Sequence, residues 1–377
     1  MNKCIVVSDS FKGTLSSLEI CAIAREAAGR ACPACELVCI PVADGGEGTV
    51  DCFLQALEGR RVVCEATGPW GEPVRAAYCR AGDRAVIEMA AAAGLPLAGE
   101  RLNPERTTTF GVGQLIRHAV EGGCREVLLG LGGSCTNDGG CGCAAALGAA
   151  FYRADGSTFV PVGADLDQIC RIDLTACRRL LEGVTVTAMC DVDSPLWGPG
   201  GAARVFAPQK GADPAMVERL DRRLRRFDEI LRRELGSDAG RMPGGGAAGG
   251  MGAGCAALLG ARLRPGIEAV LDMVDFDRLL EGADLVVTGE GRADGQSARG
   301  KVVSGVARRA GPRGVPLAVI AGSAAPEADA LYELGVTALF VTDREGEGFP
   351  RCADRAGENY RRTLEDVLRL AEAMGRR

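Results

Sequence analysis

Lysine is scarce in this chain, and its positions single out segments that could do chemistry. Lys and Arg together number 44, but lysine occurs only at residues 3, 12, 210 and 301. Three of the four stand next to a glycine, in the segments FKG, QKG and GKV, and glycine lets a backbone bend closely around a ligand. Lysine is a compact, flexible charge that suits a phosphate oxygen. Lys12, Lys210 and Lys301 are therefore candidate phosphate-binding residues, although each taken alone could be an ordinary loop residue.

The segment GLGGSCTNDGG, residues 130–140, concentrates small polar side chains between an expected strand and an expected helix. A helix cap needs one residue of this kind, and four occur within five positions. The free N–H groups of a helix N-terminus, with hydroxyls beside them, suit a phosphate or a carboxylate. We therefore predict an anion site here rather than a simple cap. Its predicted members are Gly132, Gly133, Ser134, Thr136, Asn137 and Asp138.

Two carboxylates share one side of the segment CDVDSPL, residues 190–196, at the exit of an apolar strand. Like charges so placed are costly without a cation, and Mg²⁺ is commonly held by one or two carboxylates together with nucleotide phosphates. A turn opened by Asp193 is the alternative, but it accounts for one aspartate and not for both. Asp191 and Asp193 are therefore predicted metal ligands.

Two further segments place carboxylates beside glycines. ADGGEGT, residues 43–49, offers Asp44 and Glu47 around Gly45 and Gly46, or simply a sharp turn before a helix at 49–58.

The other segment, residues 289–301, contains the GxxxxGK half of a P-loop, but Val302 takes the Ser/Thr position and the preceding strand ends too early. We reject the P-loop fold. Lys301 with Glu290 and Asp294 still fits a site for phosphate and metal.

The single histidine limits the possible mechanisms. His118 falls on the polar side of a helical run whose apolar face contains Leu115 and Ile116. It is therefore expected at the surface, and no GxSxG-type nucleophile motif accompanies it. Carboxylates must carry any acid–base work.

Composition indicates an ordinary globular protein. The chain has 377 residues, 47% hydrophobic and 25% charged, with a net charge of −6, so nucleic-acid or membrane partners are not expected. No signal or membrane-spanning stretch is evident, which favours the cytoplasm. The 17 cysteines lack the spacing of a disulfide scaffold. We expect buried small residues, with a zinc site at the CxxC motif Cys32–Cys35 as the lesser alternative.

Short β-branched runs that end in glycine-rich or acidic loops predict strands, and helical patterns separate most of them. Such alternation is typical of an α/β protein with parallel sheets, in which ligands bind beyond the carboxyl ends of the strands. The expected strands are residues 4–10, 37–46, 126–134, 184–193, 283–291, 316–323 and 338–343. The expected helices are residues 15–30, 105–121, 214–236, 299–310 and 353–374.

The middle of the chain differs from its ends. Residues 62–83 predict an antiparallel hairpin around Gly68-Pro-Trp-Gly71. The Gly/Ala-rich residues 243–254 could be a hinge, a close helix contact or a phosphate loop, and a hinge is the simplest of these. We predict a flavodoxin-like domain of residues 1–61 and 278–377, interrupted by an inserted α/β domain of residues 62–277, with the active site in the interdomain cleft. Segments 8–14, 43–49 and 289–301 would belong to the outer domain.

Seven motifs occur in order between residues 9 and 301: DSFKG, PVADGGEGT, GGSCTNDGG, CDVDSPL, PQKGA, AAGGMGAG, and GEGRADGQ followed by GK. Together they resemble the bacterial glycerate kinase family, which is unrelated to P-loop kinases. The resemblance covers nearly the whole chain and is far more specific than any single motif. It implies a flavodoxin-like domain interrupted by a second α/β domain. It also implies ATP- and Mg²⁺-dependent phosphorylation of D-glycerate, usually to 2-phosphoglycerate.

This resemblance adds Asp9 and Ser10, beside Lys12, to the predicted site. Lys12 and Lys210 would neutralise the transferring phosphoryl group, and Asp44 or Asp138 would orient the attacking hydroxyl and take its proton. The expected partners are D-glycerate and ATP, and the expected assembly is a monomer or a homodimer. The alternatives are a kinase of another small hydroxy acid, or a non-catalytic sensor of sugar acids.

Overall fold

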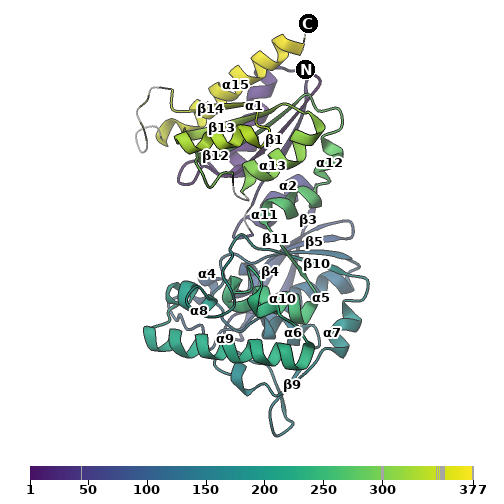
Figure 1. The fold of residues 1–377 in the computed structure, drawn as a ribbon. Helices are drawn as coiled ribbons and strands as arrows, with labels where there is room; N and C mark the ends of the chain where they lie inside the picture. The colour runs from purple at the N-terminus through teal and green to yellow at the C-terminus, as the bar shows by residue number, and fades with distance from the viewer. Residues whose placement is uncertain (44, 299–300, 345, 347, 349–352, 376–377) are drawn as a thin grey trace. The chain divides into compact units, whose positions relative to one another are not determined.

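The computed structural model describes residues 1–377 apart from 44, 299–300, 345, 347, 349–352 and 376–377 (Figure 1). The chain forms two compact units. Unit 1 contains Met1–Ala43, Gln55–Leu57 and Ile267–Arg377, and unit 2 contains Asp44–Leu54 and Glu58–Gly266. The domain limits given above remain a prediction.

Unit 1 is built on a five-stranded parallel sheet in the order β14-β13-β12-β1-β2. Numbered along the chain, this is the 2-1-3-4-5 order of flavodoxin-like folds, which confirms the predicted fold class. The strand order reverses between β1 and β12, where Cys4 pairs with Leu285 and Ser8 with Gly289. The strands are β1 (Lys3–Ser8), β2 (Glu36–Pro41), β12 (Leu285–Ala293), β13 (Leu317–Ala324) and β14 (Ala338–Val341).

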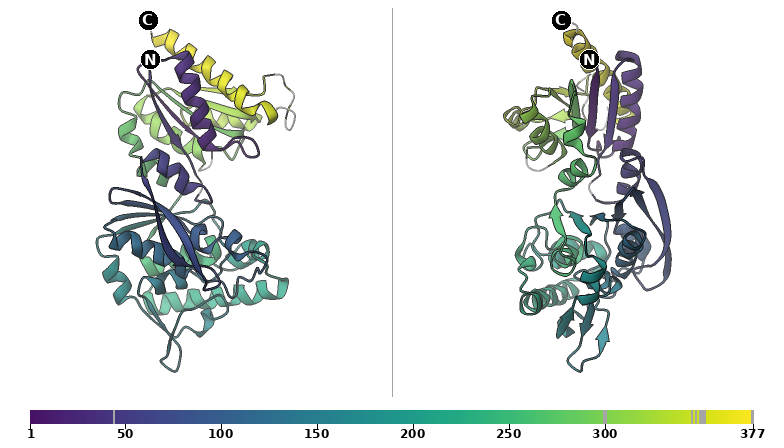
Figure 2. Two further views of the ribbon diagram at one scale, coloured as in Figure 1. Left: turned by 180° about the vertical axis from the view of Figure 1, so that it is seen from behind. Right: turned by 90° about the vertical axis from the view of Figure 1, so that its right-hand side faces the viewer.

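Helices cover both faces of this sheet. Cys4, Val6 and Ile320 belong to a core shared with α1 (Ser17–Ala31) and α15 (Ala356–Gly375), and Figure 2 shows these two helices side by side. α1 begins where Ser16 and Glu19 form a capping box. The other helices in this part of the chain are α2 (Thr49–Ala56), α11 (Gly266–Met273), α12 (Phe276–Leu279), α13 (Val302–Ala310) and α14 (Ala330–Glu333).

Unit 2 contains a six-stranded mixed sheet in the order β11-β10-β6-β5-β4-β3. Strands β5, β6, β10 and β11 run parallel, while β3 and β4 form the predicted antiparallel hairpin. A small sheet of β8, β7 and β9 was not predicted. The bounds are β3 (Arg60–Thr67), β4 (Pro73–Ala81), β5 (Arg84–Glu88), β6 (Glu126–Gly130), β7 (Ala150–Tyr152), β8 (Thr158–Phe159), β9 (Arg171–Asp173), β10 (Thr185–Met189) and β11 (Arg262–Arg264).

The longest helix of unit 2, α9 (Pro214–Leu235), is capped by Asp213 and ends at Gly236 in the left-handed conformation. Its arginines pair with acidic neighbours on the same helix, as in the contact of Arg226 with Glu229 over 2.8 Å. The remaining helices are α3 (Ala90–Ala93), α4 (Leu95–Ala98), α5 (Phe110–Glu121), α6 (Cys141–Ala146), α7 (Thr175–Leu180), α8 (Ala202–Phe206) and α10 (Ala247–Leu259).

The Gly/Ala-rich segment is not a hinge. It forms α10, whose helical backbone is interrupted at Ala248, Gly249 and Gly250 by left-handed conformations. A Cβ at Gly254 would lie 2.2 Å from the Gly139 carbonyl oxygen, so glycine lets the helix approach the 134–140 loop backbone to backbone. Of the three alternatives considered, the close helix contact is what the structure shows.

Candidate functional site

In unit 1 the predicted residues gather at the carboxyl ends of β1 and β12, the position where ligands bind in this fold class. The Asp9 amide donates to the Gly289 carbonyl over 2.9 Å, and Ser10 donates its amide to Asp9 Oδ1 over 2.7 Å. A Cβ on Gly291 would lie only 3.2 Å from the Phe11 Cα atom. The exposed turn that carries Lys12 therefore rests on the end of β12.

Glu290 lies at this position with 6% of its surface exposed. Its Oε1 has no hydrogen-bond partner among the described residues, nor has Oγ1 of the buried Thr288. Burial raises the pKa of Glu290, while Ser297 and Lys301 act in the opposite direction. Thr288 was not predicted, because a threonine inside an apolar strand carries no signal in the sequence. Unsatisfied buried polar atoms of this kind indicate a place for a ligand or a water.

The remaining unit 1 candidates follow Glu290 along the chain. Asp294 closes a turn in which its Oδ1 accepts from the Gln296 amide over 2.8 Å and its own amide donates to Ser297 Oγ over 2.9 Å. Lys301 is exposed and stands at the N-cap of α13, without a side-chain capping bond. A cation therefore stands beside a helix N-terminus, which suits an anion.

Unit 2 contains a second polar centre around Lys210, which is 1% exposed. Its Nζ donates to Ser134 Oγ and to the Thr136 carbonyl oxygen, both over 2.7 Å. Burial lowers the pKa of Lys210 to about 8, although the nearby Cys135 and Asp138 act to raise it. Lys210, a predicted phosphate-binding residue, is thus an enclosed cation at the start of the 134–140 loop.

The side chains of Thr136 and Asn137 in this loop are buried without hydrogen-bond partners among the described residues. Thr136 Oγ1 and both amide atoms of Asn137 make no hydrogen bond with any described residue, and both residues are fully enclosed. An unmade hydrogen bond of this kind typically costs about 1–3 kcal/mol. Together with Lys210, these groups offer donors and acceptors to a polar ligand or to water.

Unlike the side chains of Thr136 and Asn137, the side chain of Asp138 has several hydrogen-bond partners. Its carboxylate accepts hydrogen bonds from the amide and hydroxyl of Thr109, both over 2.8 Å, and from the amides of Gly140 and Gly142. It thereby ties the first residues of α5 and α6 together. Burial raises its pKa, and these hydrogen bonds oppose that effect. The geometry supports a positioning role for Asp138.

Replacing Asp138 with asparagine is expected to lower the free energy of unfolding by about 2–4 kcal/mol, because an amide nitrogen would face a backbone donor in a closed site. Urea unfolding measures this loss. The control is Asp155→Asn, since Asp155 accepts from Ser157 at the surface, and a much smaller change is expected there. Equal effects would contradict the structural importance of Asp138.

Residues 45–49 belong to unit 2 and pack against the end of β6. The Gly132 amide donates to the Gly45 carbonyl over 2.9 Å, and a Cβ on Gly130 would lie 2.4 Å from that oxygen. Glycines on both sides permit this backbone contact, in which Gly46 also takes part. Glu47 and Gly133 are exposed, and Asp44 lies outside the described residues.

The predicted metal ligands Asp191 and Asp193 follow β10 and are exposed. Asp191 Oδ1 accepts from the Gly266 amide over 2.7 Å, which orients the carboxylate. Within the described part of the chain, no group of three or more His, Cys, Asp or Glu side chains could hold a metal. Two carboxylates remain compatible with Mg²⁺, which takes its other ligands from phosphate and water.

His118 and the cysteines match their expected roles. His118 is exposed on α5, with Nδ1 3.1 Å from the Tyr78 hydroxyl oxygen. Most described cysteines are buried, and no disulfide joins them. Acid–base chemistry in the described site is therefore left to carboxylates.

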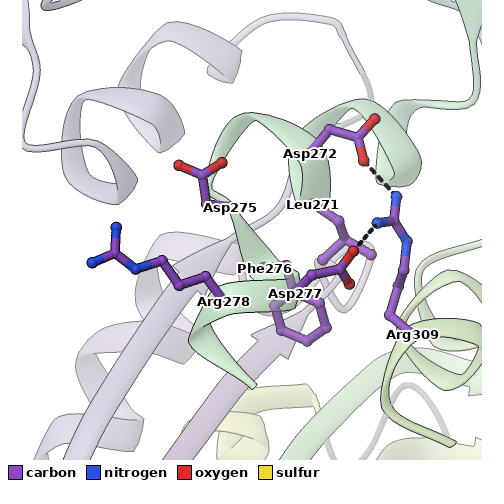
Figure 3. Close-up of a pocket in the computed structure, with 7 residues that line it drawn as sticks. All are labelled: Leu271, Asp272, Asp275, Phe276, Asp277, Arg278 and Arg309. Carbon is purple, nitrogen blue, oxygen red and sulfur yellow. Dashed lines mark hydrogen bonds and ion pairs between the residues drawn. The ribbon is translucent and has the colours of Figure 1, made fainter. Parts of the chain in front are cut away.

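A pocket of about 390 Å³ lies at α11 and α12 of unit 1 (Figure 3). Arg309 forms part of its wall and pairs with Asp272 and Asp277. None of the predicted site residues lines it, and the ion pairs of Arg309 with Asp272 and Asp277 join α13 to α11 and α12. The pocket is therefore not part of the candidate site.

The two units define a two-part α/β enzyme with polar, glycine-lined centres and buried cationic and carboxylic groups. The family model for the glycerate kinase family matches residues 4–372. A glycerate kinase from Bacillus cereus is 43% identical over 97% of both chains, and a glycerate 2-kinase from Escherichia coli is 41% identical over 98% of this chain and 100% of its own. A crystal structure described as a glycerate kinase 2 from Salmonella typhimurium LT2 matches with a TM-score of 0.86, 40% identity and full coverage of both chains.

The chain belongs to the glycerate kinase family. It is accordingly an enzyme that phosphorylates glycerate. Among the described residues, no helix combines the length and apolar character that a bilayer crossing requires.

Proposed function

We propose that the protein transfers the γ-phosphoryl group of ATP to the 2-hydroxyl of D-glycerate, with Mg²⁺, giving 2-phosphoglycerate and ADP. The observation that carries this proposal is the enclosed Lys210, with the hydroxyl of Ser134 on its Nζ and the unpartnered side chains of Thr136 and Asn137 beside it. A buried cation among polar groups suits an anionic substrate. The name of the Escherichia coli relative supports the position of transfer.

In the proposed reaction, the glycerate hydroxyl oxygen bonds to the γ-phosphorus as the bond to the ADP oxygen breaks. Lys12, Lys210 and Lys301 would stabilise the charge on the transferring group, which is the main catalytic requirement of phosphoryl transfer. Because the carboxylate of Asp138 already accepts four hydrogen bonds, we propose Asp44 as the residue that receives the hydroxyl proton.

The carboxylate oxygens of Asp191 and Asp193 fit Mg²⁺ chemically, and these residues would hold it. The ion would supply charge neutralisation to the phosphate oxygens. The remaining polar candidates, Asp9, Ser10, Glu47, Glu290 and Asp294, would orient the substrates.

The test measures ADP release in a coupled assay with D-glycerate as the substrate, and identifies the product by phosphorus NMR. A 2-phosphoglycerate signal that requires both ATP and Mg²⁺ is expected. Formation of 3-phosphoglycerate alone would contradict the assigned hydroxyl, and faster turnover of tartronate or lactate would contradict the substrate. Ligand-induced thermal stabilisation without turnover would favour the non-catalytic sensor.

The variant Lys12→Arg is expected to lower kcat by about tenfold or more, because a planar guanidinium does not replace a compact ammonium at a phosphate. Steady-state kinetics with both substrates measures the change. Lys3→Arg is the control, since Lys3 Nζ contacts only the Glu281 carbonyl in the described structure. Near-normal turnover of Lys12→Arg would exclude a specific requirement for lysine.

A further inference from the structure

The CxxC motif of unit 1 forms a tight turn between α1 and β2 that the catalytic site does not use. The Cys35 amide donates to the Cys32 carbonyl over 3.0 Å, and Pro33 occupies the second position, where a β-turn favours it. The ends of such a turn lie within about 7 Å of each other, and disulfides join Cα atoms that are about 4.4–6.8 Å apart. The backbone therefore already has the spacing that a disulfide requires.

The two thiols also interact. Burial raises the pKa of Cys32, and a hydrogen bond with Cys35 opposes this effect. Burial is the main cause that raises the pKa of Cys35 to about 11, and the neighbouring Cys32 raises it further. Cys32 is 4% exposed, whereas Cys35 is partly accessible. One thiol of the pair is therefore open to a reagent, and the other lies within reach of it.

We propose that Cys32 and Cys35 form an intramolecular disulfide by exchange with a low-molecular-weight disulfide such as oxidised glutathione. The Cys35 thiolate attacks one glutathione sulfur, forms a mixed disulfide and releases one glutathione thiolate. The Cys32 thiolate then attacks Cys35 Sγ and releases the second. The protein loses two hydrogens, and one oxidised glutathione becomes two reduced molecules.

The position of the turn predicts the effect of the bond. It precedes β2 at the amino end of the sheet, where the Glu36 amide donates to the Asn2 carbonyl over 2.8 Å. Asp9, Lys12 and Glu290 lie at the opposite, carboxyl end. The disulfide therefore fastens the junction of α1 with β2 without touching the catalytic residues. Because both thiols are weakly acidic, its formation is slow near neutral pH and faster in mild alkali.

A second pair, Cys21 on α1 and Cys39 on β2, provides the internal comparison. The Cys39 thiol interacts with Cys21 through a hydrogen bond that lowers its pKa. Cys21, however, is only 1% exposed. No turn links these two residues. We expect the exchange at the CxxC pair and not here.

The experiment incubates the full-length protein with oxidised glutathione at about pH 8, then blocks the remaining thiols and maps peptides by mass spectrometry. The expected result is a Cys32–Cys35 bond, a melting temperature raised by about 2–4 °C, and unchanged turnover of glycerate. Cys32→Ser/Cys35→Ser should lose both the bond and the shift, while Cys39→Ser should keep both.

A stable glutathione adduct at Cys35, a Cys21–Cys39 bond, or no reaction of either pair would overturn the proposal. Oxidation could instead reduce turnover in a way that a reductant reverses and that the double variant Cys32→Ser/Cys35→Ser does not show. That result would contradict the claim that the disulfide leaves the catalytic end of the sheet unaffected. Turnover is measured on the reduced protein first, so failure of the proposed kinase activity is distinguishable from failure of the disulfide.

Discussion

Replacing Lys210 with methionine is expected to lower kcat by about 100- to 1,000-fold while the protein remains folded. Methionine keeps an unbranched chain of similar length but removes the charge that Ser134 and the Thr136 carbonyl hold in place. Loss of the ammonium leaves the Ser134 hydroxyl and the Thr136 carbonyl without this donor, which typically costs about 1–3 kcal/mol, but it also removes a costly buried charge. Steady-state kinetics and thermal unfolding of the same sample separate the two effects. Lys3→Met is the matched control, and turnover within threefold or so of wild type for Lys210→Met would contradict the proposed role of Lys210.

The pH dependence gives an independent test of this lysine. Its folded pKa of about 8 lies below the ordinary 10.5, so the unfolded chain binds more protons between these values. Stability therefore gains a contribution as pH rises through this window, on the order of 3 kcal/mol for this group. The Lys210→Met variant lacks that gain. The difference in unfolding free energy between the wild type and this variant should therefore change between pH about 8 and 10.5. A constant difference would contradict the burial of a charged Lys210.

The second large effect is expected for Gly249→Ala in the interrupted part of α10. At this residue φ is +70°, and a methyl carbon would lie 2.1 Å from the Thr136 carbonyl oxygen and 2.5 Å from the Asn137 Cα atom. Both are backbone atoms, so the loop itself must move. We expect a loss of about 2–5 kcal/mol in the free energy of unfolding, and reduced kcat because Ser134 and Lys210 lose their arrangement.

Gly260 provides the control for this substitution. It ends the same helix with φ of +67°, and nothing lies within 4 Å of the position of an added Cβ. Gly260→Ala therefore carries the backbone strain alone, about 1–2 kcal/mol, and should keep normal turnover. Urea unfolding and kinetics of both variants measure the difference. Similar losses in the two variants would show that the contact with the 134–140 loop has no importance of its own.

The larger elements of the fold were predictable because their patterns are local. All seven expected strands are present, each an apolar run that ends at a polar loop. The β7 to β9 sheet was missed because its strands are two or three residues long, too short for a periodic pattern. α10 was missed because glycine disfavours helices, and its close packing against residues 134–140 is visible only in three dimensions.

The site was predictable in its residue types but not in its burial. A glycine next to Lys210 suggested a loop that bends around a ligand, and only the structure shows this ammonium enclosed by Ser134 and Thr136, 76 and 74 residues away. The same limit applies to Asp138, whose partner Thr109 lies 29 residues earlier. Such contacts depend on tertiary packing, which no local pattern encodes.

The strand order of unit 1 has a consequence for biosynthesis. β1 is an interior strand of its sheet, yet its neighbour β12 follows more than half the chain later, and Lys3 donates its amide to Asp284 across 281 residues. At about 5–20 residues per second on the ribosome, β1 waits on the order of 15–60 s before this partner is made. During that interval its apolar edge is open to wrong pairing. A newly made chain therefore passes through a period in which unit 2 can fold while the β12 side of β1 is still unpaired.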